Sequence, residues 1–430
     1  MEESPVEKKK ILIISPYFPP SNLAAVHRSR LFAQHLPAFG WEPVILMVDE
    51  KFYEERLDWG LVKLLPENLR IEKVSAYRLT RPRLIGDIGL RAFLQLYRKA
   101  KEIIKKEKIN FLLIPIPSFY TALLGRWLHA STGIKYGIDY IDPWVHSFPG
   151  SNRLFSRHWW STKLAKILEP IAVKKASLIT GVAEGYYIGV QERNPALIGT
   201  CKFGAMPYGG EAEDHKKIKS INSQPYLFSK KPGKIQLVYA GAMLPKAYQL
   251  LEAIFQSIQH ERFLFENVIF HFIGTGKTAN DPEGFNIKPF AEKFDLWQNQ
   301  VFEYPARIPY LDVLIHLEAA DGIFILGSTE AHYTPSKIYQ ALLAKKPVLA
   351  VLHRQSTAVE ILRKSGGGIV IDFNGEEDLA SIRTGFANGF RNYLSFIEKF
   401  KSTLVDVNSL STWSAENITG QLAGYLDSVI

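Results

Sequence analysis

The sequence predicts an α/β protein of two domains, each a parallel β-sheet with helices on both faces. The chain has 430 residues, more than one hydrophobic core usually fills. Short apolar runs bounded by turn residues alternate with longer amphipathic stretches, as in parallel sheets with intervening helices. A polar, lysine-rich stretch interrupts this alternation. We therefore expect a first domain over 1–208, a linker or surface loop over 209–234, a second domain over 235–410, and a C-terminal helix within 411–430 that packs back towards the first domain.

The first apolar run covers residues 11–14 and is followed by a helical stretch over 24–36. Further strands of the first domain are expected at 43–48, 111–114, 136–140 and 178–181. The second set of strands is expected at 235–239, 268–273, 322–326, 347–351 and 368–371. The spacing of apolar residues over 413–429 predicts one amphipathic helix. Because sheets of this kind bind ligands at the carboxyl ends of their strands, we expect the functional site there.

Composition indicates the cellular compartment of the protein and the charge of its partner. No window has the roughly 18 uncharged apolar residues of a membrane-spanning helix, and the charged start of the chain does not resemble a signal peptide. The single cysteine, Cys201, excludes an internal disulfide and fits a reducing compartment. We expect a cytoplasmic protein, with peripheral association at the inner face of the membrane left open. The formal net charge of +9 indicates an anionic partner: a phosphate-bearing substrate, an anionic membrane surface or nucleic acid.

The segment 327–340 of the second domain predicts a phosphate site. It follows a strand and opens a helix, with Thr334 as a candidate cap and Pro335 at the first helical position. Ser336 and Lys337 would then lie in the first turn, where free N–H groups, a hydroxyl and an ammonium suit a diphosphate. The alternative is an ordinary capped helix with a solvated lysine.

Two glycine-containing turns in the same domain strengthen this hypothesis. Gly274 and Gly276 follow the strand 268–273, and glycine allows the backbone to come close to a ligand. A lone Gly-x-Gly is more often a tight turn only. Gly241 follows the strand 235–239 and precedes Lys246. Three such elements in one domain favour the phosphate site.

The order and spacing of several segments of the first domain are similar to those of one known family. These segments are 15–20, 28–36 with 40–42, 139–144, 178–186 and 207–209. Over nearly its whole length the chain resembles family 4 glycosyltransferases of the GT-B fold, in which two Rossmann-like domains face each other across a cleft. The resemblance implies transfer of a sugar from a nucleotide-sugar to a glycan or lipid-linked acceptor, with retention of anomeric configuration, in polysaccharide or glycoconjugate biosynthesis. No cofactor and no metal are expected, because the Asp-x-Asp motif of metal-dependent GT-A enzymes is absent.

The resemblance also assigns roles in the second domain. The loop after its first strand would meet the donor diphosphate, the next glycine turn would lie beside it, the loop at Arg307 would bind the base, and the helix start at Lys337 would hold diphosphate and ribose. The donor residues implied are Gly241, Lys246, Gly274, Gly276, Arg307, Ile308, Thr334, Ser336, Lys337 and Gln340.

The chain departs from the family pattern at two positions where members commonly carry glutamates, here His332 and Gln340. An amide can still hydrogen-bond ribose hydroxyls, whereas His332 cannot copy a carboxylate, although Glu330 is near. An arginine common before the first-loop lysine is absent, so neutralisation of the diphosphate falls to Lys246 and Lys337, which we assign as catalytic. The alternative is a catalytically silent GT-B protein that binds a sugar nucleotide or acts as a scaffold.

On the acceptor side the candidates are Arg28, Asp142 and His146. Asp142 is also a catalytic candidate, since a carboxylate with a raised pKa can act as a general base; the alternative is a helix-capping aspartate next to Pro143. Arg28 could reach the donor phosphate or an acidic acceptor, or it could pair with a carboxylate on its own helix.

Two basic stretches leave contact with an anionic surface open. The first, 78–108, has ten Lys or Arg against three acids. The second, 153–175, interleaves Phe155, Trp159 and Trp160 with cations, as in an interfacial helix on anionic lipid. Solvated helix faces with core aromatics are the alternative. Nucleic acid is not expected as a partner, because no nucleic-acid-binding motif is recognised.

Overall fold

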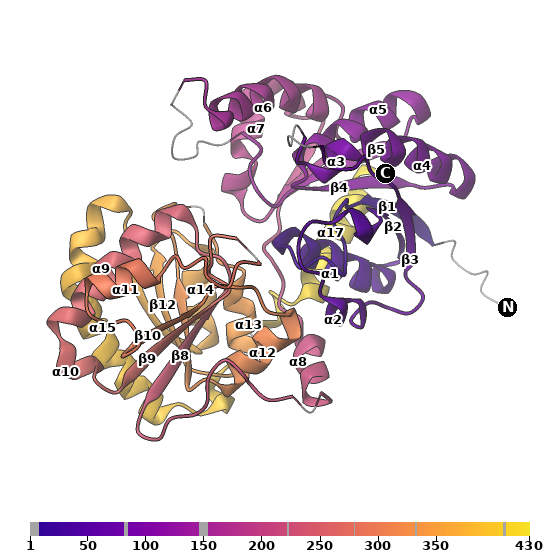
Figure 1. The fold of residues 1–430 in the computed structure, drawn as a ribbon. Coiled ribbons are helices and arrows are strands. Elements are labelled where there is room, and N and C mark those ends of the chain that lie inside the picture. The colour runs from indigo at the N-terminus through magenta and orange to yellow at the C-terminus, as the bar shows by residue number, and fades with distance from the viewer. Residues whose placement is uncertain are drawn as a thin grey trace. The chain divides into compact units, whose positions relative to one another are not determined.

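The computed structural model describes residues 8–80, 85–145, 154–221, 223–278, 280–331, 333–406 and 410–430. The chain divides into two compact units, shown in Figure 1: Met1–Gly209 together with Ala415–Ile430, and Gly210–Ser414. Each unit has its own parallel sheet and its own hydrophobic core. The predicted α/β class is therefore confirmed.

The first unit is built on a seven-stranded parallel sheet in the order β3-β2-β1-β4-β5-β6-β7. Its central strands are buried on both faces, which explains their continuous apolar sequences. Ile13 of β1, for example, pairs with Ile45 of β2 on one side and Leu113 of β4 on the other. The strands are β1 (Lys9–Ile14), β2 (Trp41–Val48), β3 (Arg70–Val74), β4 (Phe111–Ile116), β5 (Lys135–Tyr140), β6 (Leu178–Gly181) and β7 (Lys202–Ala205).

Helices cover both faces of this sheet: α1 (Ala24–His35), α2 (Trp59–Val62), α3 (Ile88–Arg91), α4 (Phe93–Glu107), α5 (Ala122–Thr132), α6 (Arg157–Val173), α7 (Ile188–Arg193) and α17 (Ala415–Val429). Although α17 comes from the far end of the chain, it lies beside α1 (yellow and indigo in Figure 1). Its apolar side chains join the same core as Trp41, whose indole N–H donates to Asp427 at 3.1 Å. The last helix is thus part of the first unit.

The second unit has a six-stranded parallel sheet in the order β10-β9-β8-β11-β12-β13. Its strands are β8 (Ile235–Ala240), β9 (Val268–Ile273), β10 (Val301–Tyr304), β11 (Gly322–Leu326), β12 (Val348–His353) and β13 (Gly368–Phe373). Its helices are α8 (Ala212–Lys219), α9 (Tyr248–His260), α10 (Arg262–Phe265), α11 (Lys288–Lys293), α12 (Tyr310–Ala319), α13 (Lys337–Leu343), α14 (Thr357–Ser365) and α15 (Leu379–Lys399). In neither unit does a helix of the described residues have the length and apolarity to cross a bilayer.

The structure contains elements that the apolar patterns did not predict. Strands β3, β7 and β10 are all at sheet edges, where a strand needs fewer buried side chains and its sequence reads as mixed polar and apolar. The stretch expected as a linker contains helix α8, whose buried residues Asp214, His215 and Ile218 are mostly polar and so gave little hydrophobic signal.

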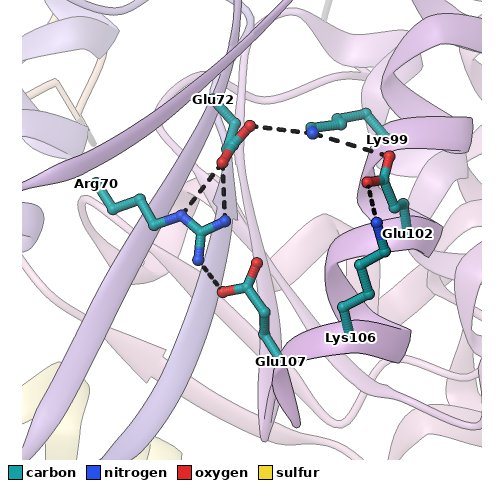
Figure 2. A network of polar contacts seen from close by, with 6 residues as sticks. All are labelled: Arg70, Glu72, Lys99, Glu102, Lys106 and Glu107. Carbon is teal, nitrogen blue, oxygen red and sulfur yellow. Dashed lines mark hydrogen bonds and ion pairs between the residues drawn. The ribbon is translucent and has the colours of Figure 1, made fainter.

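A surface network of ion pairs joins β3 to α4, as Figure 2 shows. Arg70 of β3 pairs with Glu107 of α4 and, at 2.8 Å, with Glu72. Glu72 also accepts from Lys99 of α4 at 3.1 Å, and Lys106 pairs with Glu102 one turn earlier at 2.8 Å. Exposed pairs of this kind add little stability each. They do, however, give part of the basic stretch 78–108 acidic partners within the protein itself.

Candidate functional site

The ends of neighbouring strands bring two of the predicted glycine turns together in the second unit. Strands β8 and β9 pair along their length, and each runs into a glycine with a left-handed backbone: Gly241 has φ +102° and Gly274 φ +70°. A Cβ added to Gly274 would lie 3.8 Å from the Cα atoms of both Gly241 and Arg307. Three separate sequence segments therefore meet at one edge of the sheet, as expected for this kind of fold.

Lys337, the first residue of α13, brings a charge to this point. Its Nζ donates to the Tyr239 hydroxyl at 2.6 Å and to the carbonyl oxygen of Ala242 at 2.9 Å. The ammonium also lies 3.8 Å from the centre of the Tyr239 ring. A Cβ on Gly241 would come within 3.0 Å of the Lys337 Cε, so glycine at this position leaves room for the lysine. Two of its three N–H donors are used, which leaves one for a ligand.

The surroundings of Lys337 weaken its positive charge in the absence of a ligand. Burial lowers the pKa of its ammonium to about 7, and the nearby charge of Arg307 acts in the same direction. A lysine in such a place gains most from an anion, because the anion stabilises the protonated form that burial disfavours. The geometry and the charge together make the Gly241 turn a candidate anion site.

Tyr239 is a site residue that the sequence analysis missed. It lies at the end of β8, buried, and its hydroxyl donates to the Ala242 carbonyl at 3.2 Å as well as accepting from Lys337. Its only sequence signal was its position two residues before Gly241. A tyrosine there reads as an ordinary core residue, because nothing in the sequence shows that Lys337 will reach it.

The other predicted donor residues differ in how the structure uses them. Lys246, in a short 3-10 helix (Pro245–Ala247), is half-buried, and its side chain has no partner among the described residues. Gly276 approaches the chain at Pro305, where an added Cβ would lie 2.7 Å from the carbonyl oxygen. Ser336 precedes α13 and makes no capping side-chain bond, and Ile308 is half-buried.

The predicted helix start is wrong in one detail. Helix α13 begins at Lys337 with Ser336 before it, so Thr334 is not the cap and Pro335 is not its first residue. The Thr334 hydroxyl is buried and bonded to the Thr357 hydroxyl at 2.7 Å. This bond ties the loop to the start of α14, and no side chain caps the N-terminus of α13.

Gln340 lies one turn into α13, where its amide joins two other helices. Its Oε1 is 2.9 Å from His215 Nε2 of α8, and its Nε2 donates to the Tyr310 hydroxyl of α12 at 2.8 Å. Tyr310 donates in turn to Asp214 at 2.8 Å. Gln340 therefore has a structural role in this unit, and a ribose would have to use the remaining capacity of its amide. His332 lies outside the described residues.

In the first unit, Arg28 is occupied by a buried ion pair. Its Nε and Nη2 donate to the two carboxylate oxygens of Asp139 at 2.6 and 3.0 Å, and its Nη1 donates to the Pro207 carbonyl at 3.0 Å. Arg28 is 2% exposed and Asp139 is 0% exposed. The predicted pairing with a carboxylate on the same helix is therefore wrong, because the partner is Asp139 of β5. We accordingly treat Arg28 as a structural residue.

Asp142 follows β5 in a stretch of bends, and residues 141–145 are not helical, so its predicted alternative as a helix cap is wrong. Desolvation raises the pKa of the Asp142 carboxyl to about 6, while the residue as a whole is exposed. Even a pKa of about 6 lies below neutral pH. Asp142 is then ionised at neutral pH and able to accept a proton. His146 lies outside the described residues.

Comparisons with known proteins identify the fold. No family model and no curated protein matches the chain. Among solved structures, sucrose-phosphate synthase from Thermosynechococcus elongatus is similar with a TM-score of 0.64 and 13% identity, over 98% of this chain and 99% of that one. Anabaena HepE in complex with UDP is similar with a TM-score of 0.59 and 14% identity, over 98% and 100%. A putative UDP-N-acetylglucosamine 2-epimerase from Listeria monocytogenes is similar with a TM-score of 0.53 and 11% identity, over 98% and 96%.

These similarities extend over nearly the whole length of each protein, and the chain has the GT-B fold. At such low identity they define the fold alone. Transferases and an epimerase share this fold, so the fold does not determine the reaction and only the residues of the site can indicate it.

Proposed function

We propose that the protein is a glycosyltransferase that takes a sugar from a nucleotide-sugar bound in its second unit and passes it to a glycan or lipid-linked acceptor. The observation that carries this proposal is the Lys337 ammonium held at the Gly241 turn, with Gly274 and Arg307 beside it. A diphosphate fits there because the glycine backbone leaves room for its oxygens and the positive charge of Lys337 offsets their negative charge. Uridine nucleotides are the first donors to test, since HepE of the same fold was solved with UDP.

In this proposal the protein works mainly on the leaving group. As the bond from the anomeric carbon to the diphosphate oxygen breaks, negative charge grows on the diphosphate, and Lys337 and Lys246 stabilise it. The acceptor hydroxyl forms the new bond to the same carbon and loses its proton, for which Asp142 is the proposed base or orienting group. Retention of configuration, absence of a metal requirement, and a role in polysaccharide or glycoconjugate synthesis remain parts of the proposal.

A catalytically silent sugar-nucleotide-binding or scaffold protein is the second candidate. The observation that favours it is Gln340, whose amide holds His215 and Tyr310 in the position where the family resemblance expects a glutamate. Such a protein would bind a donor without product formation across a panel of acceptors.

A thermal-shift screen against UDP-, GDP-, ADP-, CMP- and dTDP-sugars tests donor binding. A ligand that binds only the folded protein at about a hundred times its Kd adds roughly 2.7 kcal/mol of stability, so we expect the matching donor to raise Tm by on the order of 5 °C. Lys337→Met should abolish this shift, whereas Lys364→Met, which changes an exposed lysine of α14, should not. If no nucleotide-sugar of the panel shifts Tm, the donor site is not formed as proposed.

Donor binding should also take up a proton. At pH 8 a Lys337 amine with a pKa of about 7 is mostly neutral, and a bound diphosphate raises that pKa, so binding should take up about one proton. At pH 5.5 the amine is already protonated and no proton should be taken up through it. Calorimetric titration with UDP-glucose in buffers of different ionisation enthalpy measures this difference. Intact binding at pH 8 without proton uptake would show either that Lys337 is already protonated in the free protein or that it does not meet the diphosphate; the Lys337→Met thermal shift separates these two cases.

A further inference from the structure

Helix α6 of the first unit has two apolar faces, and only one of them is packed. Ala165, Ala172 and Val173 are buried on one side, where α6 packs against α5. On the opposite side, residues three or four apart form a continuous exposed stripe: Trp160, Leu164, Ile167 and Ile171. At about 100° per residue these four fall within roughly 60° of arc. We call them the α6 stripe.

The α6 stripe is extended at its start by Leu154 and Phe155, which are also exposed. Large apolar side chains scattered singly on a surface need no explanation, but a contiguous row does. Here Trp160 is 57% exposed and Ile167 is 63% exposed. Phe155, Trp159 and Trp160 touch one another, with ring centroids 4.8 to 6.4 Å apart. The result is an aromatic cluster at one end of an aliphatic row.

The charges around the α6 stripe are all positive among the described side chains of 154–175. Lys163, Lys166, Lys174 and Lys175 are exposed, and the Lys163 ammonium lies 5.5 Å from the centre of the Trp159 ring. The single acid of this segment, Glu169, is on the packed side, where it is 0% exposed and paired with Arg193 at 2.7 Å. The exposed face of α6 therefore offers apolar surface bordered by cations.

The other basic stretch predicted from the sequence is different. On α4, Lys99 and Lys106 are bound to Glu72 and Glu102, and Arg70 of the neighbouring strand is bound to Glu72 and Glu107 (Figure 2). The apolar residues Leu96, Ala100 and Ile103 of α4 are buried in the core. Two of the α4 cations thus have acidic partners and the apolar face of α4 is packed in the core, whereas neither is true of the exposed face of α6.

We propose that the α6 stripe docks on an anionic lipid bilayer, with its apolar side chains in the boundary of headgroups and acyl chains. Lysines bordering such a stripe can extend towards lipid phosphates while their stems stay on the apolar surface, and aromatic rings suit the interface. Pairing of two copies through this face would bring the lysines of both together without acids to offset them. Docking of α6 uses none of the donor-site residues.

Co-sedimentation with vesicles tests the proposal on the full-length protein. We expect binding to vesicles of phosphatidylcholine mixed with phosphatidylglycerol, weaker binding as salt is raised, and little binding to phosphatidylcholine alone. Trp160→Ser and Ile167→Ser should each lower the partition coefficient by about tenfold. Replacing Lys163 and Lys166 by glutamate should abolish the preference for anionic lipid. The matched control is Trp59→Ser, because Trp59 of α2 is 55% exposed in the same unit and should leave partitioning unchanged.

Two results would overturn the proposal. One is equal partitioning of the wild-type protein, Trp160→Ser and Trp59→Ser. The other is a dimer in solution, detected by light scattering without lipid, that Ile167→Ser dissociates, because the stripe would then be an interface between copies. A thermal melt of each variant ensures that a loss of partitioning is not a loss of folding; the solvent-facing substitutions should leave Tm nearly unchanged.

Discussion

Lys337→Met should reduce sugar transfer by about a hundredfold to a thousandfold, the usual loss when one stabilising group is removed from a developing negative charge. The variant should fold, since methionine keeps much of the lysine's apolar stem. Its Tm should be equal to or above that of the wild-type protein at pH 7. The folded pKa of Lys337 is below the ordinary 10.5, so the charged form disfavours folding, and this cost is fully present at and below pH 7 and disappears as pH rises towards 10.5.

The measurement is the initial rate of donor consumption and product formation, by chromatography, with an acceptor found by screening. Lys364→Met, an exposed lysine on α14 that is paired with Glu360, serves as the control and should keep the wild-type rate. If Lys337→Met keeps the wild-type rate, Lys337 has no catalytic role. If the variant binds donor as tightly as the wild type but does not turn over, Lys337 stabilises the transition state and does not contribute to ground-state binding of the donor.

Asp139→Asn should strongly destabilise the first unit. It leaves the Arg28 guanidinium buried without its counter-charge, which costs about 3–5 kcal/mol when a buried pair loses one partner. For a unit of this size that corresponds to a fall in Tm of on the order of 10 °C. Scanning calorimetry measures the fall, and the transition that moves identifies the first unit, since the second has a core of its own.

Thr180→Val is the matched control for Asp139→Asn. It removes only the hydroxyl that donates to the Asp139 carboxylate at 2.6 Å, so its cost should be about 1.5–3 kcal/mol, less than the loss of the buried ion pair. An Asp139→Asn protein that melts as the wild type but no longer binds an acceptor would mean that the Arg28–Asp139 pair belongs to a binding site, and would restore the acceptor-side hypothesis for Arg28.

Part of the candidate donor site could be predicted from the sequence, because a few residue types at particular positions indicate a particular backbone conformation or ligand. A glycine directly after a strand, as at Gly241 and Gly274, indicates a left-handed turn, and a lysine at a helix start indicates an anion. The position of Tyr239 over Lys337 and the use of Gln340 to join α8 and α12 were not predictable. Tyr239 and Lys337, like Gln340 and His215, are about 100 or more residues apart in the sequence. Nothing in the sequence around Tyr310 indicates that it will contact Gln340.

The sequence by itself determined the α/β class and the central strands of both sheets, because strands buried on both faces must be continuous apolar runs. Only the tertiary structure decided β3, β7 and β10, three of the four edge strands, because these are partly exposed and their sequences mix polar and apolar residues. It also decided that Arg28 pairs with Asp139, that Thr334 binds Thr357, and that α6 exposes one of its two apolar faces. The physical reason is the same in each case: polar partners and burial depend on which surfaces meet in space, and the local order of residues does not specify that.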